Sequence, residues 1–226
     1  MSRILITGSA SGLGLCMARA LRDDGHTVID YDIKDGRDVR EPHDSFIRSL
    51  GALDVLINSA GINRIGWLED VTEGTWDEVL NVNAKGIFMM TKACLPLLAE
   101  SKGTVLNIVS NASHMPMTCS LAYNASKGAA HVMTLQLARE LTRKWGITVF
   151  GISPNKLTGT GMSCDIEKQV VATRGWTLGQ ARDYQLASLL AGSETDPAAL
   201  AEFVAFLLKS KRNHQYLTGC IIPYGA

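Results

Sequence analysis

Three side chains that can move a proton together lie close in the sequence, between residues 107 and 127. They are Ser110, Tyr123 and Lys127. A phenol can give a proton to a carbonyl oxygen or take it back, and a nearby ammonium group favours the phenolate, lowering a reference pKa of about 10. A serine hydroxyl can donate a second hydrogen bond to that oxygen as it becomes negative. The three residue types therefore indicate acid–base chemistry at a carbon–oxygen bond.

Local structure has to bring these groups together. The apolar run at residues 104–109 predicts a buried strand that ends just before Ser110. Tyr123 and Lys127 begin a long helical pattern, and their spacing of four places both side chains on one face of a helix. For this pair alone, an amphipathic helix that carries Tyr and Lys by chance is the simpler interpretation. Motifs elsewhere in the chain decide between a catalytic pair and a chance occurrence.

A glycine-rich turn follows the first apolar run. Residues 3–7 predict a strand, residues 15–21 predict a helix, and between them lies Gly8-Ser-Ala-Ser-Gly-Leu-Gly14. Such a turn aims backbone N–H groups and a helix N-terminus at an anion, and glycine lets a pyrophosphate approach the backbone closely. A glycine-rich loop without a ligand is the alternative, but the position between a strand and a helix favours a dinucleotide site.

The second predicted strand, at residues 26–33, gives a further sign of a dinucleotide. Near its end stands Asp32, 18 residues beyond Gly14. A carboxylate there can accept hydrogen bonds from both ribose hydroxyls of adenosine and would repel a 2′-phosphate, so the sequence favours NAD over NADP. Asp30 is a competing acid, and either one is also explained as a strand-end cap. Asp38 follows only six residues after Asp32, too few for a full helix, so we expect this crossover to be cut short or replaced by a loop.

Strand and helix patterns alternate along most of the chain. Further strands are predicted at residues 53–57, 104–109, 147–153 and 219–223, and helices at residues 74–99, 120–145 and 196–208. The alternation predicts an α/β fold, a Rossmann-type doubly wound parallel sheet with helices on both faces. The length suits a single domain over residues 1–226. Residues 155–193 break the alternation and are interpreted as a small substrate-binding cap of short helices.

Composition narrows the classes of partner. The chain has 22 basic and 22 acidic residues and no formal net charge, which argues against nucleic acid or an anionic membrane surface as the main partner. No apolar run of about 18 residues occurs, so no membrane-spanning helix is predicted. Five cysteines without a Cys-x-x-Cys pair indicate reduced thiols and a cytoplasmic protein. The five histidines show no metal-ligand spacing, and no metal site is predicted.

Five separated motifs together resemble the short-chain dehydrogenase/reductase family, and the resemblance covers nearly the whole chain. In order they are Thr7-Gly-Ser-Ala-Ser-Gly-Leu-Gly14, Asn58-Ser-Ala-Gly61, Asn83 within a helix, Ser110, and Tyr123-x-x-x-Lys127. Any one of them could arise by chance, whereas all five at the expected spacing are highly specific. The resemblance implies a nicotinamide dinucleotide that exchanges hydride with the substrate, while the protein positions the reactants and handles the proton.

The resemblance also implies a role for each matching residue. Tyr123 would be the general acid/base on the substrate oxygen, and Ser110 would orient that oxygen and stabilise its charge. Lys127 would bind the nicotinamide ribose and lower the pKa of Tyr123. Asn83 would hold a helix kink and a water that passes protons from Lys127 toward solvent. The implied cofactor-binding residues are Gly8, Ser11, Gly12, Leu13, Gly14, Asp32, Asp38, Val39, Asn58, Ala60, Gly61, Tyr123, Lys127, Pro154, Leu157, Thr158 and Thr160.

Three positions depart from the family pattern. Pro154-Asn155 replaces the usual Pro-Gly after the strand at residues 147–153, although asparagine tolerates a left-handed backbone better than most residues. The threonine that would meet the nicotinamide carboxamide is one residue out of step, which leaves Thr158 and Thr160 as alternatives. Tyr224-Gly225 stands where Asp-Gly-Gly is more common.

The main hypothesis is an NAD(H)-dependent oxidoreductase that acts on a small-molecule alcohol or ketone and assembles as a homodimer or homotetramer. The rival hypothesis is a non-catalytic dinucleotide-sensing protein on the same fold. Such proteins usually lose a catalytic residue, and here all four are present. Near the site, Asn63 and Arg64 could recognise a polar or anionic substrate, but a solvated loop is the simpler interpretation of both.

Overall fold

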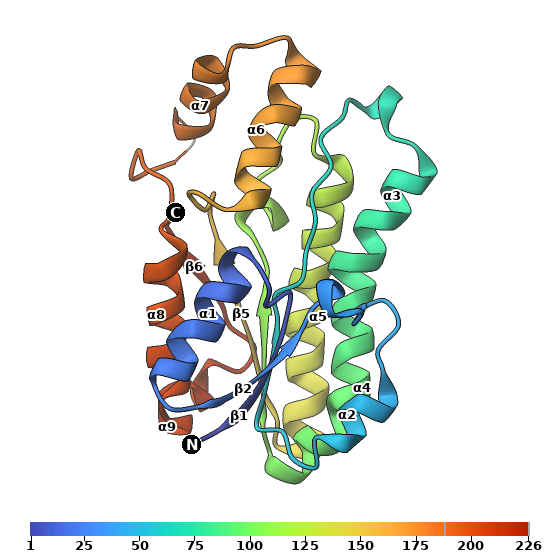
Figure 1. Ribbon diagram of the computed structural model, residues 1–226, viewed down its shortest axis with the longest axis vertical. Coiled ribbons are helices and arrows are strands. Elements are labelled where there is room, and N and C mark those ends of the chain that lie inside the picture. The colour runs from blue at the N-terminus through green and yellow to red at the C-terminus, as the bar shows by residue number, and fades with distance from the viewer. Residues whose placement is uncertain (188, 226) are drawn as a thin grey trace.

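A computed structural model describes residues 1–187 and 189–225, which form one parallel sheet with helices on both faces (Figure 1). Residues 188 and 226, which belong to the predicted cap and domain, lie outside the described residues. The strand order is β2-β1-β3-β4-β5-β6. The strands are β1 (Arg3–Thr7), β2 (Thr27–Tyr31), β3 (Val55–Asn58), β4 (Thr104–Ile108), β5 (Thr148–Pro154) and β6 (Ile221–Tyr224). The order runs outward from β1 in both directions, which is the doubly wound arrangement that the sequence predicted.

Helices cover both faces of this sheet. In Figure 1, α1 and α8 lie on one side of it, and α4 and α5 lie on the other. The helices are α1 (Gly12–Asp23), α2 (Asp44–Ser49), α3 (Glu73–Leu80), α4 (Gly86–Ser101), α5 (Leu121–Trp145), α6 (Gly161–Arg174), α7 (Leu178–Ala187), α8 (Pro197–Leu208) and α9 (Lys211–His214). The result is a three-layer α/β domain.

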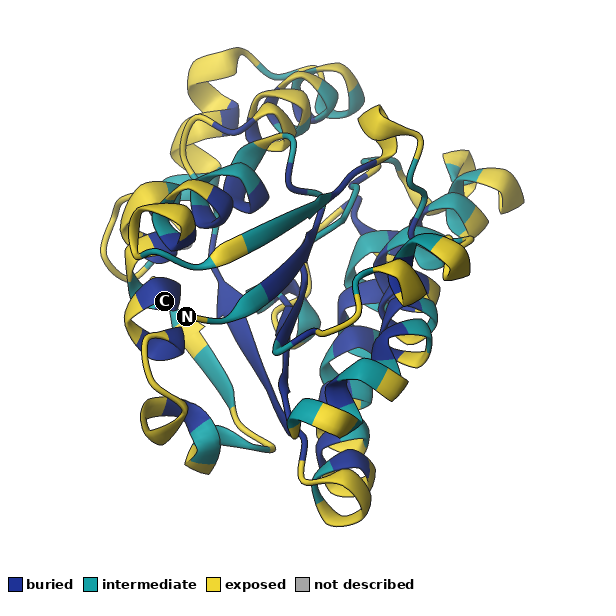
Figure 2. Ribbon diagram, turned by 60° about the horizontal axis from the view of Figure 1, so that its bottom comes forward, coloured by how far each residue is buried: buried dark blue, intermediate teal, exposed yellow. Residues whose placement is uncertain are grey.

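The central strands are apolar throughout because both faces of the sheet are buried. Successive side chains of a strand point to opposite faces. In β1, Ile4 and Ile6 pack in the core under α1 and α8, whereas Leu5 packs in the core under α4 and α5. All three are fully buried, and burying each stabilises the fold by roughly 1.5–3 kcal/mol. Figure 2 shows the same pattern, with buried strands at the centre and exposed outer faces on the helices.

The crossover from β2 to β3 is short, as the sequence predicted. It contains a 3₁₀ turn, Ile33–Asp35, and the six-residue helix α2. Tyr31 at the end of β2 is fully buried, and its ring lies 6.1 Å from that of Phe46 in α2. Strand β2 lies at the edge of the sheet, and Asp32 directly follows it.

The helix predicted at residues 74–99 is interrupted. A π-helical turn, Asn81–Lys85, joins α3 to α4 and carries Asn83, which is fully buried. Such turns hold one extra residue and frequently occur at functional sites. The family resemblance implied a local helix kink at Asn83, and the structure has a π-helical turn at that position.

The predicted short helices of the cap are α6 and α7, which stand beyond the end of the sheet where the strands finish (Figure 1). Lys156, which follows β5, pairs with Glu167 in α6 at 2.9 Å and with Glu194 in the returning loop at 2.5 Å. These ion pairs tie the cap to the chain segment that leaves the sheet. Within the described residues, no helix has the length and apolar character needed to cross a membrane.

Candidate active site

Strand β4 and helix α5 bring Ser110 and Tyr123 together. Ser110 lies two residues beyond the end of β4 and caps a 3₁₀ turn, Asn111–Ser113, in which its Oγ accepts a hydrogen bond from the Ala112 N–H at 3.2 Å. This turn returns the chain toward α5 and brings the Ser110 hydroxyl close enough to the Tyr123 phenol to lower its pKa. The structure therefore places the two hydroxyls side by side, as the sequence predicted.

Lys127 lies one helical turn beyond Tyr123 and is buried. Its Nζ lies 5.8 Å from the centroid of the Tyr123 ring and donates a hydrogen bond to the Ile108 carbonyl at 3.0 Å. Burial lowers the pKa of Lys127 to about 8. Burial raises the pKa of the Tyr123 phenol, and the hydrogen bond from Ser110 lowers it. In this arrangement the phenol is held protonated at neutral pH, with a hydroxyl and an ammonium group beside it.

Asn124 holds the Ser110 turn in place, a role that the sequence did not suggest. Its Nδ2 donates hydrogen bonds to the carbonyls of Ala112 at 3.0 Å and Met115 at 3.2 Å. The residue thus clamps the turn that carries Ser110 onto the helix that carries Tyr123. A polar residue next to Tyr123 on the helix was the available signal, but nothing in the sequence indicated which loop it would bind.

The Asn83 side chain is tied to the active-site loop and to α5. Its Oδ1 accepts from the Ile62 N–H at 2.8 Å, and its Nδ2 donates to the Ile62 carbonyl and to Ser126 Oγ, both at 2.9 Å. Ser126 in turn donates to the Tyr123 carbonyl at 2.7 Å. The π-turn is therefore connected to the helix that carries Tyr123 and Lys127. Ser126 was also missed, although it lies next to Lys127 in the sequence.

The loop after β3 passes beside these groups because its residues are small. A Cβ added to Gly61 would lie 3.3 Å from Asn83 Oδ1 and 3.8 Å from Lys127 Nζ. One residue earlier, the Ala60 N–H donates to Thr7 Oγ1 at 3.1 Å. Thr7 at the end of β1 thus fixes the start of the loop, and the structure brings the Asn58–Gly61 motif into contact with the catalytic candidates.

The glycine-rich turn is closely packed. A Cβ on Gly14 would lie 2.1 Å from the Gly8 carbonyl oxygen, and a Cβ on Gly8 would lie 2.8 Å from Ala60 Cα. Gly12 has a φ of 52° and begins α1, with the exposed Ser11 as its N-cap, while Leu13 is buried in the core. The turn therefore presents backbone and the α1 N-terminus at its outer side, which suits an approaching phosphate.

The edge strand delivers Asp32 to the same turn. The Asp32 carboxylate is buried and accepts hydrogen bonds from the Ala10 N–H at 3.0 Å and the Lys34 N–H at 2.9 Å. The competing acid, Asp30, is instead paired with Arg22 at 2.5 Å on the surface. Asp32 is thus the carboxylate that faces the glycine-rich turn.

Asp38 and Val39 follow the cut-short crossover. The carboxylate of Asp38 binds Arg40, with the Nε of the arginine 2.9 Å from Oδ2, and this pairing holds the pKa of Asp38 below its usual value. The Val39 side chain is buried, and a Cβ on Gly86 would lie 2.8 Å from its Cγ2. The side chains of both residues are therefore occupied within the protein, and the Asp38 carbonyl also accepts a hydrogen bond from the Glu41 N–H at 3.2 Å.

Two buried polar atoms near the glycine-rich turn and the β3 end lack a hydrogen-bond partner within the described residues. They are Ser9 Oγ and Asn58 Oδ1. The Nδ2 of Asn58 is satisfied, since it donates to Asn107 Oδ1 at 2.8 Å. Buried polar groups are nearly always hydrogen-bonded, so such atoms indicate a ligand or water. Together with the glycine cradle, they fit a dinucleotide lying across the ends of β1 and β3.

The segment after β5 distinguishes the two candidate threonines. Pro154 is the last residue of β5, and Leu157 forms an isolated bridge with Thr195. Thr158 is exposed, whereas Thr160 is buried, caps α6 through the Ser163 N–H at 3.1 Å, and is the nearest neighbour of a Cβ built on Gly12. The structure brings Thr160, and not Thr158, to the glycine-rich turn.

The buried Lys127 gives the protein a specific pH dependence of stability. Its pKa is about 8 in the folded protein and 10.5 in the unfolded chain, so between these values the unfolded chain binds more protons and stability rises with pH. Below about pH 8 both states are protonated, and this group adds no slope. We expect Lys127→Met to be more stable than the wild type at pH 7, by up to about 3 kcal/mol.

The difference between the two proteins should shrink as the pH rises from about 8 to about 10.5, since the methionine does not titrate. Urea unfolding of both proteins at several pH values measures it. A difference that stays constant with pH would contradict the buried ammonium group.

Comparison with known proteins gives one consistent result. Residues 26–170 match the family model described as short chain dehydrogenase. Sorbitol-6-phosphate 2-dehydrogenase of Klebsiella pneumoniae is 28% identical, over 96% of this chain and 91% of that protein. The crystal structure of a variant of actinorhodin polyketide ketoreductase with NADPH is 25% identical, with a TM-score of 0.87 over 98% of this chain and 95% of the other.

A third protein, NAD⁺-bound xylitol dehydrogenase, has the same fold. Its structure superposes with a TM-score of 0.89 over 100% of this chain and 98% of the other, at 22% identity.

Proposed function

Because this chain belongs to the short-chain dehydrogenase/reductase family, we propose that it is an NAD(H)-dependent oxidoreductase that interconverts an alcohol and a carbonyl compound. Family membership itself makes the chain a dehydrogenase or reductase with a nicotinamide cofactor and a small-molecule substrate. One observation supports the finer proposal above all others. The Ser110 hydroxyl, the Tyr123 phenol and the Lys127 ammonium group meet beside Gly61 at the end of the sheet.

Tyr123 is proposed as the general acid/base. In the direction of reduction, its phenol gives a proton to the carbonyl oxygen of the substrate, and in oxidation the phenolate takes the proton from the alcohol. Burial keeps the phenol protonated, which suits the acid. The ammonium group of Lys127, 5.8 Å from the centre of the Tyr123 ring, would stabilise the phenolate when it forms. Ser110 donates a hydrogen bond to the same substrate oxygen and stabilises its developing charge. When bound, the nicotinamide supplies or accepts the hydride.

Asn83 is proposed to support proton exchange with solvent. Its amide is fully engaged with Ile62 and Ser126, so the side chain acts by holding the π-turn. A π-turn shifts the backbone hydrogen bonds by one residue, and a backbone carbonyl there is available for a water molecule. Such a water would pass protons from Lys127 toward solvent.

The dinucleotide is assigned to the glycine-rich turn and the strand ends. Backbone N–H groups around Gly8, Gly12 and Gly14 would bind the pyrophosphate. The remaining proposed contacts are Ser11 and Leu13 in the same turn, Asp38 and Val39 at the adenine, Asn58, Ala60 and Gly61 after β3, Tyr123 and Lys127 at the nicotinamide ribose, and Pro154, Leu157 and Thr160 after β5. Thr158 is the weaker alternative because it is exposed.

The preference for NAD over NADP rests on Asp32. Its carboxylate faces the glycine-rich turn and retains acceptor capacity for the two ribose hydroxyls of adenosine. A 2′-phosphate in that position would meet a buried negative charge, which is costly unless a cation pairs with it. The nearby Arg37 is directed elsewhere, since its guanidinium stacks on Phe46 at 4.2 Å.

Substrate selection is assigned to the cap at residues 155–193. The names of the relatives give different substrates, a sugar alcohol phosphate in one and a polyketide in another. Residues of this segment are expected to contribute to substrate selection in this chain, and none of those names is transferred to it.

The test is a turnover assay with purified protein. Reduction of ketones, aldehydes and quinones is followed through NADH and NADPH absorbance, and oxidation of alcohols through NAD⁺ and NADP⁺. We expect turnover with a higher kcat/KM for the NAD pair. Dinucleotide binding without turnover of any compound would favour a dinucleotide-sensing protein, and a preference for NADPH would remove the role given to Asp32.

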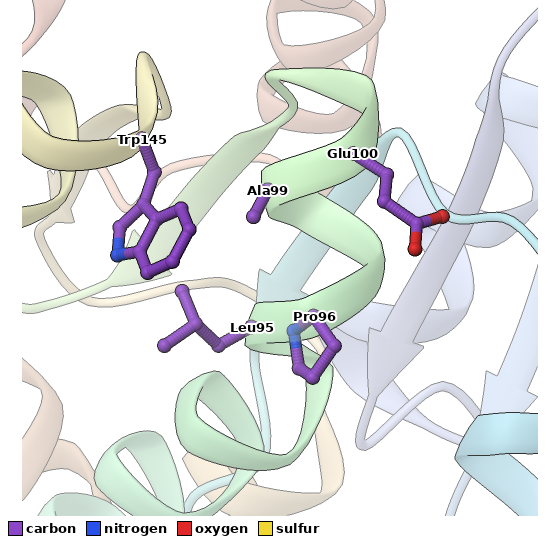
Figure 3. Close-up of a pocket in the computed structure, with 5 residues that line it drawn as sticks. All are labelled: Leu95, Pro96, Ala99, Glu100 and Trp145. Carbon is purple, nitrogen blue, oxygen red and sulfur yellow. The ribbon is translucent and has the colours of Figure 1, made fainter.

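A second copy of the chain is proposed to cover the outer faces of α4 and α5. Large apolar side chains are exposed there, among them Phe88, Val132 and Leu135. A hollow of about 460 Å³ lies between the C-terminal parts of these helices. Its lining residues, drawn in Figure 3, are Leu95, Pro96, Ala99, Glu100 and Trp145. Light scattering should give the mass of a dimer or a tetramer of the 24.4 kDa chain. A monomer at micromolar concentration would contradict this assembly.

A further inference from the structure

The side chain of Asn63 is the most unusual polar group outside the cofactor site. It is only 4% exposed, and neither its Nδ2 nor its Oδ1 has a hydrogen-bond partner among residues 1–187 and 189–225. The solvated loop expected from the sequence is therefore wrong for Asn63, although it holds for Arg64, which is exposed and pairs with Glu78 at 2.8 Å. Burying an amide without partners is unfavourable, so a group that satisfies it is expected.

The segment around Asn63 runs along the catalytic groups. Two residues earlier, Gly61 lies beside Lys127 Nζ, and Ile62 is held by Asn83 through two hydrogen bonds. Three residues later, Gly66 forms a bridge with Ser120 at the start of the helix that carries Tyr123. Asn63 thus lies between Gly61, which neighbours Lys127, and Gly66, which is bridged to the start of α5.

Helix α6 of the cap contacts the same segment. The Ile65 N–H donates to Gln169 Oε1 at 2.9 Å, and Trp67 Nε1 donates to the Thr173 carbonyl at 3.3 Å, both on α6. Arg64 is directed to Glu78 on α3, whereas Asn63 is buried within a segment that neighbours Lys127 at Gly61 and contacts α6 at Ile65. A substrate bound at Tyr123 would extend along this segment.

The chemistry of the free amide selects the kind of substrate. Nδ2 offers a donor and Oδ1 offers an acceptor, so the complementary group must both accept and donate a hydrogen bond. A hydroxyl does both. A carboxylate only accepts, and it would leave Oδ1 unsatisfied beside a negative charge.

We propose that Asn63 is a specificity-determining residue that hydrogen-bonds a substrate hydroxyl one or two carbons from the reacting carbon, so that the substrates are polyols and their hydroxyketones. This inference rests on the oxidoreductase function proposed above. A site built to bind a hydroxyl discriminates against the analogue that lacks it, because the buried amide is then left unpaired.

The experiment compares matched alcohols. Wild-type protein oxidises butan-2-ol, butane-2,3-diol, butane-1,3-diol and erythritol, and then xylitol and sorbitol against the mono-alcohols of equal chain length, with NAD⁺ and NADP⁺. We expect kcat/KM to be about tenfold to a hundredfold higher for at least one compound with the second hydroxyl. Asn63→Leu, which is similar in size, should abolish this ratio and leave the mono-alcohol rate within about threefold, since only the second hydroxyl loses its partner.

Controls separate this role from a structural one. Arg64→Gln changes the exposed neighbour and should keep the wild-type ratio. The melting temperature of Asn63→Leu should equal or exceed that of the wild type, because an unsatisfied buried amide is removed. Should that variant fail to fold, Asn63→Ala removes the amide without added bulk and is read in the same way.

The outcomes distinguish the two proposals. If mono-alcohols and polyols are oxidised equally, or if Asn63→Leu slows both equally with a lower melting temperature, the role of Asn63 is refuted and the oxidoreductase stands. If no alcohol, ketone or aldehyde turns over with either cofactor, the oxidoreductase proposal fails, and the role of Asn63 fails with it.

Discussion

Replacing Tyr123 by phenylalanine should lower kcat by about 10³-fold, because the variant keeps the ring and loses the hydroxyl placed to exchange a proton with the substrate oxygen. The hydrogen bond to Ser110 is lost as well, but the packing around the ring remains. Binding of NADH should change little, since the phenol contributes one hydrogen bond among many. Single-turnover kinetics and a fluorescence titration with NADH measure the two quantities separately.

The control for this variant is Tyr216→Phe. Tyr216 is 83% exposed and lies in a 3₁₀ turn before the start of β6. Ser110 lies after the end of β4, and because the strands are parallel it is at the other end of the strands. This control should retain wild-type kcat and NADH affinity. If Tyr123→Phe kept wild-type turnover, the acid/base would have to be another group, and the proposed function of Ser110 and Lys127 would lose its basis.

The second large effect is expected for Gly14→Ala. The added methyl group would lie 2.1 Å from the Gly8 carbonyl oxygen and 3.3 Å from Ser9 Cα, so the glycine-rich turn must open. We expect dinucleotide affinity to fall by at least about tenfold, and the free energy of unfolding to fall by about 1–3 kcal/mol. Titration with NADH and urea denaturation measure these losses.

Gly74→Ala is the matched control, because it adds the same methyl group to a glycine with room around it. Gly74 lies in α3, and the nearest atom to its added Cβ is Thr72 Oγ1 at 3.9 Å. The helix should gain about 0.5–1 kcal/mol, and NADH affinity should be unchanged. Wild-type NADH affinity in Gly14→Ala would show that the dinucleotide does not bind at this turn.

Local sequence patterns determined the fold because the signals are local. Apolar runs of four to seven residues mark strands buried on both faces, and the glycines and the Tyr–Lys spacing mark the turn and the helix face. The parallel sheet follows, since alternating strands and helices have few other ways to bury their apolar sides. The cut-short crossover before Asp38 was also readable, because six residues cannot form a full helix.

Only the tertiary structure decided which polar side chains have hydrogen-bond partners. Ser110 and Tyr123 were paired from the sequence, but the clamp from Asn124 and the tie from Asn83 to Ser126 depend on a turn and a π-helical insertion whose geometry no short motif encodes. The same holds for Thr160, which was open against Thr158 until the N-terminus of α6 placed it beside Gly12.

Asn63 shows the physical reason most clearly. As a residue type it is polar and suits a surface loop, and the sequence offered no reason to bury it. Its burial results from Ile62, Ile65 and Gly66, which are anchored to Asn83, to α6 and to the start of α5, segments that lie 21 to 104 positions away in the chain. The sequence by itself determined the elements and indicated the candidate catalytic residues. The enclosure of each polar group was decided by contacts between distant segments, which exist only once the chain has folded.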